Sequence, residues 1–185
     1  MCQALLDVAT TLIAGLLLFF LLKRPWEESK KFNECVDFFS LLTAEVYLNL
    51  AYTYLLVRGS KPLRCRFRDC NIRNFARIYP GDKPSKITKA LGLCCLMEDL
   101  NARISNSEDV SDAVYEFRTQ LITFHKDSLQ QAYEDLAARQ LHLGRGWRRF
   151  LFPFDRPEPL MPDEDLANYC KMLEKKGASD PKQSQ

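Results

Sequence analysis

Cysteine and histidine are the residue types in this chain that could ligate a metal ion or serve as nucleophile and base. Cys65 and Cys70 are separated by four residues, and Cys94 and Cys95 are adjacent. Two arginines flank Cys65 and would oppose a cation, and only two histidines are present to complete a zinc site. No nucleophile motif, P-loop or dinucleotide fingerprint accompanies His125. We therefore expect buried thiols, no metal, no cofactor and no catalytic residues.

Glu45 and Asn49 are polar residues in an otherwise apolar helical stretch. With Thr53 they recur every four residues, so they form one polar stripe along a helix. A buried carboxylate must find a partner or stay protonated. We expect a salt bridge between Glu45 and an arginine of residues 64–77. The functional alternative is a buried polar site that joins Glu45, Asn49 and Tyr52.

Residues 58–89 form the most basic part of the chain, with ten lysines and arginines, two aspartates and a net charge of +8. Residues 98–135 are acidic, with nine acids, three basic residues and a net charge of −6. The basic segment could contact that acidic region, anionic lipid headgroups or nucleic acid. No nucleic-acid-binding motif accompanies the charge, so nucleic acid is the least favoured partner. The candidate binding residues are Arg64, Arg66, Arg68, Arg73 and Arg77.

Residues 144–154 mix arginines with aromatic side chains. This mixture is typical of contact with a membrane interface, where aromatic rings enter the headgroup zone and arginines meet phosphates. The alternative is that the aromatic residues close one end of a helical core. The candidate lipid- or partner-binding residues here are Arg145, Trp147, Arg148, Arg149 and Phe150.

The elements that must position these residues begin with an apolar stretch near the N-terminus. Residues 4–22 would span about 28 Å as a helix, which matches the hydrocarbon thickness of a bilayer. The stretch is apolar on all sides, unlike a soluble helix, and it lacks the basic start and small-residue cleavage site of a signal peptide. We therefore predict a membrane anchor at residues 1–26 with a span at about 4–22.

Flanking charges predict the orientation of this span. No basic residue precedes it, whereas Lys23, Arg24, Lys30 and Lys31 follow it, and basic residues are retained on the cytoplasmic side. The N-terminus is expected outside and the rest of the chain in the cytoplasm. The odd, irregular set of seven cysteines indicates a reducing compartment and agrees with this placement.

Residues 38–57 are long enough for a second span. Glu45 would then lie near the bilayer centre, at a cost of about 2.5 kcal/mol or more. With the N-terminus outside, a second span would also export the basic segment 58–89. A hairpin with both ends in the cytoplasm avoids this but places four basic residues in its short outer loop. We favour a long core helix over 27–58, and the hairpin stays open.

Periodicity and end signals predict the remaining elements. An extended loop is expected at 61–70, and helices are expected at about 71–80, 85–104, 108–142 with Ser107 as N-cap, and 162–176. The predicted fold class is all-α, with an N-terminal transmembrane helix followed by a cytoplasmic bundle of four to five helices. The helical domain would cover 27–154, and a short helix and disordered tail would cover 155–185.

Together these features predict a non-catalytic, membrane-anchored helical scaffold, accessory subunit or regulator that docks a partner protein at the cytoplasmic membrane face. Long helices joined by short loops offer surfaces for partner helices and few places for a catalytic loop. The expected partners are the lipid bilayer and either another protein or a second copy of the chain, with no small-molecule substrate identified. The alternative is a membrane-tethered sensor or effector that binds anionic lipid or nucleic acid through residues 58–89.

Overall fold

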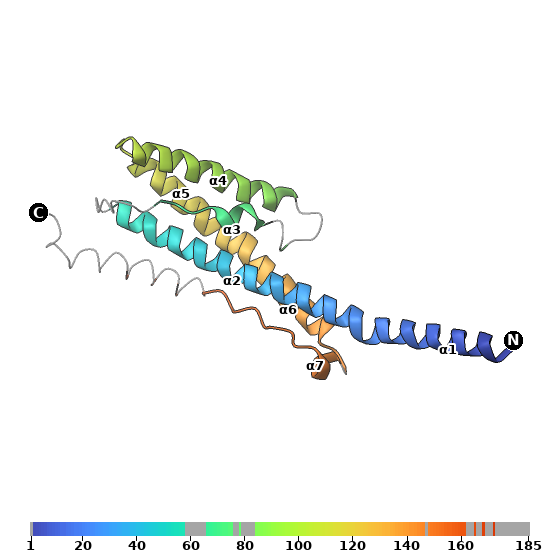
Figure 1. The fold of residues 1–185 in the computed structure, drawn as a ribbon. Coiled ribbons are helices and arrows are strands. Elements are labelled where there is room, and N and C mark those ends of the chain that lie inside the picture. The colour runs from blue at the N-terminus through green and yellow to red at the C-terminus, as the bar shows by residue number, and fades with distance from the viewer. Residues whose placement is uncertain are drawn as a thin grey trace, which may run out of the picture. The chain divides into compact units, whose positions relative to one another are not determined.

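The computed structural model describes residues 2–57, 66–75, 78, 84–146, 148–161, 165, 168 and 172 (Figure 1). These residues form helices and connecting loops, and no β-strand occurs among them, which confirms the all-α class. In chain order the elements are α1 (Cys2–Leu18), the π-helical turn η1 (Phe19–Lys23), α2 (Arg24–Val57), α3 (Cys70–Arg73), α4 (Pro84–Ser105), α5 (Ser111–Phe124), the π-helical turn η3 (His125–Leu129), α6 (Gln130–Leu143) and α7 (Arg148–Leu151). The expected count of four to five bundle helices is not confirmed.

The first three elements form one uninterrupted helix. A proline inside a helix lacks an N–H donor, and its ring crowds the carbonyl four residues earlier. The wider turn η1 ends two residues before Pro25, and the N–H of Arg24 bonds to the carbonyl of Phe19, five residues back. The helix thus continues past the proline. No turn separates residues 4–22 from residues 38–57, so the two apolar stretches do not form the hairpin that the sequence left open.

This N-terminal helix is the one helix among the described residues that is long and apolar enough to cross a membrane, by length and composition. Its most apolar window has a mean hydropathy of 1.6 and is only 6% buried. Such exposure distinguishes it from the core helix of a soluble domain, whose apolar face would be covered by other elements. The helix is therefore a candidate membrane span.

Contacts divide the chain into two compact units, which are described separately. The first unit combines Met1–Asp37 with Leu136–Pro157. The second unit combines Phe38–Asp135 with Glu158–Gln185. The unit boundary after Asp37 lies within α2, and the boundary after Asp135 lies within α6. Each of these helices therefore contributes residues to both units.

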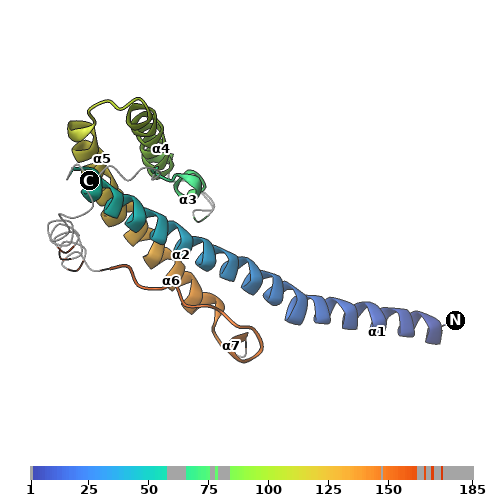
Figure 2. The ribbon, with the colours of Figure 1, turned by 60° about the vertical axis from the view of Figure 1, so that its left-hand side comes forward.

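The core of the second unit is built by α2, α4 and α5, whose buried apolar residues recur at helical spacing. Aromatic rings fill its centre, where the ring centroid of Phe67 lies 4.7 Å from Tyr52 and 4.8 Å from Phe117. At the other end of α5, Phe124 packs against Phe75. Both ribbon views show α6 beside α2 (Figures 1 and 2). These contacts fix the face of α2 that is turned inward.

The connection between α4 and α5 differs from the expected cap. Ser107 does not cap α5. Its φ of 59° places it in the left-handed region, and its N–H bonds to the carbonyl of Ile104. The N–H of Glu108 bonds to the carbonyl of Arg103, which completes a Schellman motif that ends α4. Asp109 accepts bonds from the N–H and hydroxyl of Ser111 at 3.0 and 2.8 Å, so α5 begins three residues later than predicted.

The other predicted elements agree with the structure to different degrees. Residues 66–69 are extended without regular structure, as expected, and α4 covers the predicted helix 85–104. Within the helix expected over 71–80, the structure describes the single turn α3 and a turn at Asn74, and residues 76, 77, 79 and 80 lie outside the described part of the chain. Most of the predicted helix 162–176, the tail after it, and residue 58, where the predicted core helix ends, lie outside the described residues.

Candidate functional site

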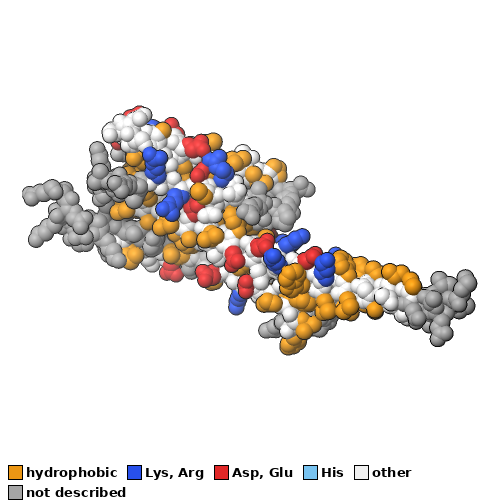
Figure 3. Space-filling model, in the orientation of Figure 1, with side chains coloured by type: hydrophobic (Ala, Val, Ile, Leu, Met, Phe, Trp, Pro, Cys, Tyr) orange, Lys and Arg blue, Asp and Glu red, His pale blue; other side chains and the backbone are white. Residues whose placement is uncertain are grey.

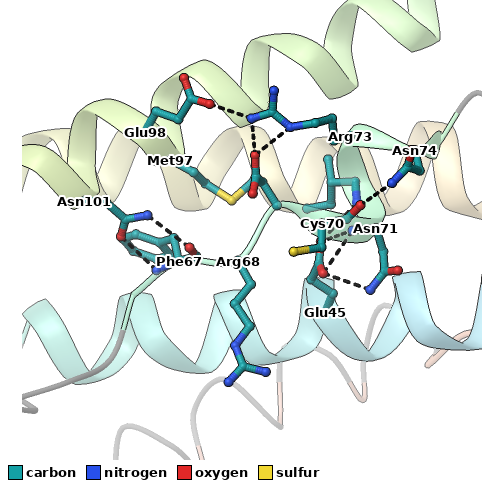
Figure 4. Close-up of polar contacts among 12 residues, drawn as sticks. Glu45, Phe67, Arg68, Cys70, Asn71, Arg73, Asn74, Met97, Glu98 and Asn101 are labelled. Carbon is teal, nitrogen blue, oxygen red and sulfur yellow. Dashed lines mark hydrogen bonds and ion pairs between the residues drawn. The ribbon is translucent and has the colours of Figure 1, made fainter.

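The carboxylate of Glu45 is buried and binds the start of α3 (Figure 4). Its Oε1 accepts the backbone N–H groups of Asn71 and Ile72 at 3.0 Å, and its Oε2 accepts the side-chain amide of Asn71 at 2.9 Å. The first N–H groups of a helix lack acceptors within the helix and favour a negative charge. Among the described residues, backbone donors of this segment rather than its arginines bind Glu45, and Arg64 and Arg77 lie outside those residues.

Asn49 and Asn101 hold the extended chain between α2 and α4. Asn49 accepts the N–H of Arg68 at 3.0 Å and donates to its carbonyl at 2.6 Å. From α4, Asn101 does the same for Phe67, at 2.9 and 3.0 Å. Each amide side chain thus takes the place of a neighbouring strand and satisfies both polar groups of one residue. The polar stripe of α2 has a structural role, because it binds the backbone of residues 67–72.

The arginines of the basic segment divide into paired and solvent-exposed groups. Arg73 forms ion pairs with Asp69 and with Glu98, the latter at 2.5 Å. Arg66 and Arg68 are exposed and form no ion pair with another described residue. In Figure 4 the Arg68 side chain points away from this cluster of polar contacts. Internal acids thus neutralise part of the basic charge and leave two guanidinium groups facing solvent.

One described ion pair joins the basic segment to the predicted acidic helix, in addition to the ring contacts of Phe67 with Phe117 and of Phe75 with Phe124. Lys89 of α4 lies 3.2 Å from Asp127 of η3, and both side chains are about half exposed. Arg64 and Arg77 lie outside the described residues. An exposed pair of this kind contributes little to stability.

His125 lies in the π-helical turn and is buried against Tyr47. The tyrosine oxygen is 3.1 Å from Nε2 of His125 and accepts the N–H of Met161 at 2.9 Å. The histidine tautomer decides which of the two groups donates this hydrogen bond. The sequence did not point to Tyr47. The buried ring nitrogen Nε2 of His125 therefore has a hydrogen-bond partner.

The cysteines of the described region differ in solvent exposure. Cys94 is buried, and this burial raises the pKa of its thiol to about 11. Cys70 and Cys95 are exposed. Among the residues that the structure describes, no group of three or more histidine, cysteine, aspartate or glutamate side chains could hold a metal ion. Cys65 lies outside that set.

The outward face of α2 carries a feature that sequence reasoning missed. Leu41, Leu48 and Leu55 are 59%, 59% and 36% exposed, and they follow one another at seven-residue intervals. Ala44, also exposed, and Ala51 lie between them. We name these five residues the leucine stripe. The seven-residue spacing of these leucines is visible in the sequence. The polar stripe of Glu45 and Asn49, however, lies on the buried face of α2, whereas the leucines lie on the exposed face.

Residues 144–154 lie in the first unit and pack against the start of α2. Asn33 donates to the carbonyl of Pro153 at 3.2 Å and accepts the N–H of Asp155 at 3.0 Å. Ser29 also donates to Pro153. The ring centroids of Phe32 and Phe154 are 6.1 Å apart. These contacts agree with the interpretation that aromatic residues close a helical core.

Other residues of the same segment face outward. Phe150 and Leu151 are 87% and 58% exposed, and Arg145 is exposed. Arg148 lies 3.3 Å from Glu28. Trp147 and the side chain of Arg149 lie outside the described part of the chain. The side chains of this segment that pack against α2 and those that face outward are therefore different residues.

The structure thus brings Glu45 and Asn49 together around residues 67–72, and it places Arg145, Arg148 and Phe150 in a different unit. Glycine 146, with φ of 65°, makes the left-handed turn that directs the chain from α6 into α7. Comparisons of this chain with models of protein families, with curated proteins and with solved structures found no match.

Proposed function

We propose that this protein is a non-catalytic, membrane-anchored helical scaffold, accessory subunit or regulator that docks a partner protein at the cytoplasmic face of a membrane. The observation that carries the docking role is the leucine stripe. It extends over fifteen residues, from Leu41 to Leu55, a rise of about 21 Å along the helix, and none of its five residues is charged.

The pattern of the stripe indicates the kind of partner. Leucines at seven-residue intervals with alanines between them reproduce the a and d positions of a helical packing seam. Alanine allows a second helix to approach closely, and leucine supplies the apolar area that is buried on contact. The expected partner surface is an amphipathic helix with an apolar seam of its own.

Anchoring is supported by the exposed apolar helix and its flanking charges. Residues 4–22 would span the bilayer, with the N-terminus outside. Lys23 and Arg24 would lie among the headgroups on the cytoplasmic side, together with Trp26, which is exposed as an interfacial tryptophan should be. A tag-accessibility assay at both termini tests this topology, and an accessible C-terminus on the outside would reverse it.

A non-catalytic role is supported by the buried polar groups, which form hydrogen bonds within the protein. Glu45 and Asn49 bind backbone, and the nitrogen Nε2 of His125 bonds to a tyrosine. The exposed guanidinium groups of Arg66 and Arg68 favour the second candidate, a tethered sensor or effector that binds anionic lipid or nucleic acid through residues 58–89.

The docking proposal is tested by affinity capture from detergent-solubilised membranes. Wild type is compared with Leu41→Glu/Leu48→Glu and with Leu91→Glu, which changes an exposed leucine of α4 outside the stripe. We expect proteins captured by wild type and by Leu91→Glu to be lost from the double variant. Capture of the same proteins by all three would refute docking through the stripe.

A further inference from the structure

The first unit contains an open apolar groove beside the candidate span. Its volume is about 610 Å³, within the range of small-molecule sites. The groove is lined mainly by residues of the N-terminal helix, and Phe152 supplies one wall from the segment after α7. The principal lining residues are Gly15, Leu18, Phe19, Leu22, Trp26 and Phe152.

The shape of the groove depends on a glycine, and its chemistry depends on one lysine. A methyl group placed on Gly15 would meet no atom within 4 Å, so this part of the groove is open space. Every other lining side chain is apolar except Lys23, whose amino group lies 5.6 Å from the ring of Phe19. The site therefore combines a long apolar surface with a single cationic group.

The cationic end of the groove has additional positive charge around it. Arg24 and Arg148 both pair with Glu28, at 3.1 and 3.3 Å. Two cations thus share one carboxylate, and Lys23 has no acidic partner among the described residues. An anionic group bound beside Lys23 would form a charge-assisted hydrogen bond with its ammonium group and neutralise its charge.

The exposed residues of α7 belong to the same surface. Phe150 and Leu151 face outward while Phe152 lines the groove. Figure 3 shows hydrophobic side chains over α1 and α7, and lysine and arginine side chains near the start of α2. Apolar side chains beside basic ones are the pattern by which a segment enters the headgroup region of a bilayer.

We propose that this groove binds an anionic phospholipid, with one acyl chain lying along Gly15, Leu18 and Leu22 and the phosphate at Lys23. The lipid belongs to the leaflet on the basic side of the span, because the groove runs from mid-span to the basic flank. Phe150 and Leu151 then enter the interface beside it. The proposal rests on the proposed anchoring through residues 4–22.

The test uses the full chain reconstituted in nanodiscs of phosphatidylcholine and phosphatidylglycerol. Lipids that remain bound after extraction into mild detergent are counted by native mass spectrometry. Gly15→Leu fills the groove, and Gly92→Leu is the matched control, because a methyl at Gly92 also meets no atom within 4 Å. We expect wild type and Gly92→Leu to retain phosphatidylglycerol. Gly15→Leu should retain several-fold less, because its side chain occupies the open space where the acyl chain would lie and so removes the packing contacts made there.

Lys23→Gln tests the charge separately and does not fill the groove. Its preference for phosphatidylglycerol over phosphatidylcholine should fall about fivefold, the effect of one basic residue at a membrane surface. Equal lipid retention by Gly15→Leu and wild type would overturn the groove assignment. An unchanged lipid preference in Lys23→Gln would overturn the phosphate assignment.

Alkaline carbonate extraction distinguishes failure of the site from failure of the anchor. The proposal requires wild type, Gly15→Leu and Lys23→Gln all to stay in the membrane fraction. Release of wild type by carbonate would refute anchoring and, with it, the lipid site. Stable insertion of wild type without any retained phosphatidylglycerol would refute the lipid site alone.

Discussion

Replacement of Glu45 by alanine should loosen the segment that contains α3. The carboxylate accepts the N–H groups of Asn71 and Ile72 and the side-chain amide of Asn71. Ile72 is fully buried, so its N–H cannot turn to water, whereas Asn71 is partly exposed and can be rehydrated in part. A buried donor without an acceptor costs about 1–3 kcal/mol, so the total for both residues is about 3 kcal/mol.

Hydrogen exchange measures this cost at the residues concerned. Because 1.4 kcal/mol is a factor of ten, about 3 kcal/mol should speed exchange of the Asn71 and Ile72 amides about a hundredfold. Glu45→Gln keeps one carbonyl acceptor and should give a smaller increase, which preserves the test if the alanine variant does not fold.

Glu98→Ala is the matched control for this experiment. Glu98 binds Arg73, near the same segment, but its side chain is 63% exposed. Exposed ion pairs contribute little, so exchange should change by less than about fivefold. If Glu45→Ala and Glu98→Ala had the same effect at Asn71 and Ile72, the carboxylate would not be the acceptor that holds α3.

Three further predictions concern other parts of the second unit. Cys94 should be alkylated about a hundredfold more slowly at pH 8 than a thiol of ordinary pKa, because its pKa is raised to about 11; mass spectrometry would show the rate rising with pH up to that value, and labelling as fast as at the exposed Cys95 would contradict its burial. Phe117→Ala should lower the free energy of unfolding by about 3–5 kcal/mol in urea titrations, since the ring is fully buried, and a loss under about 1 kcal/mol would contradict its central position. Arg66→Ala/Arg68→Ala should leave binding to anionic vesicles unchanged if the scaffold role is correct, and a loss of vesicle binding would favour the lipid-binding alternative.

The helices were predictable because their signals are local. Helical spacing and end residues predicted α4 to within one residue at each end, and they predicted a long helix over 108–142, which begins three residues later, at Ser111. The predicted N-cap at Ser107 was wrong because this residue ends the preceding helix instead. Serine is a good N-cap, but here it takes the left-handed position that ends the preceding helix, while Val110 is the N-cap of the next helix and Asp109 accepts the N–H of Ser111.

The roles of the polar residues were not predictable in the same way. Asn49 and Asn101 lie in different helices, and the backbone groups that they bind belong to residues 67 and 68. Helical spacing could place Glu45 and Asn49 on one stripe but could not tell which donors would face it. The arginines nearby suggested a salt bridge, whereas the described donors to Glu45 are the backbone N–H groups of Asn71 and Ile72 and the Asn71 side-chain amide.

Composition and periodicity alone determined that this chain is helical and that its N-terminal stretch is apolar on all sides, because both are properties of neighbouring residues. Only the tertiary structure decided which face of α2 is buried. The polar stripe turns inward because buried backbone donors of residues 67–72 must be satisfied, and the leucine stripe consequently turns outward. In the first unit, likewise, only the tertiary structure decided that Phe154 packs against Phe32 while Phe150 and Leu151 stay exposed.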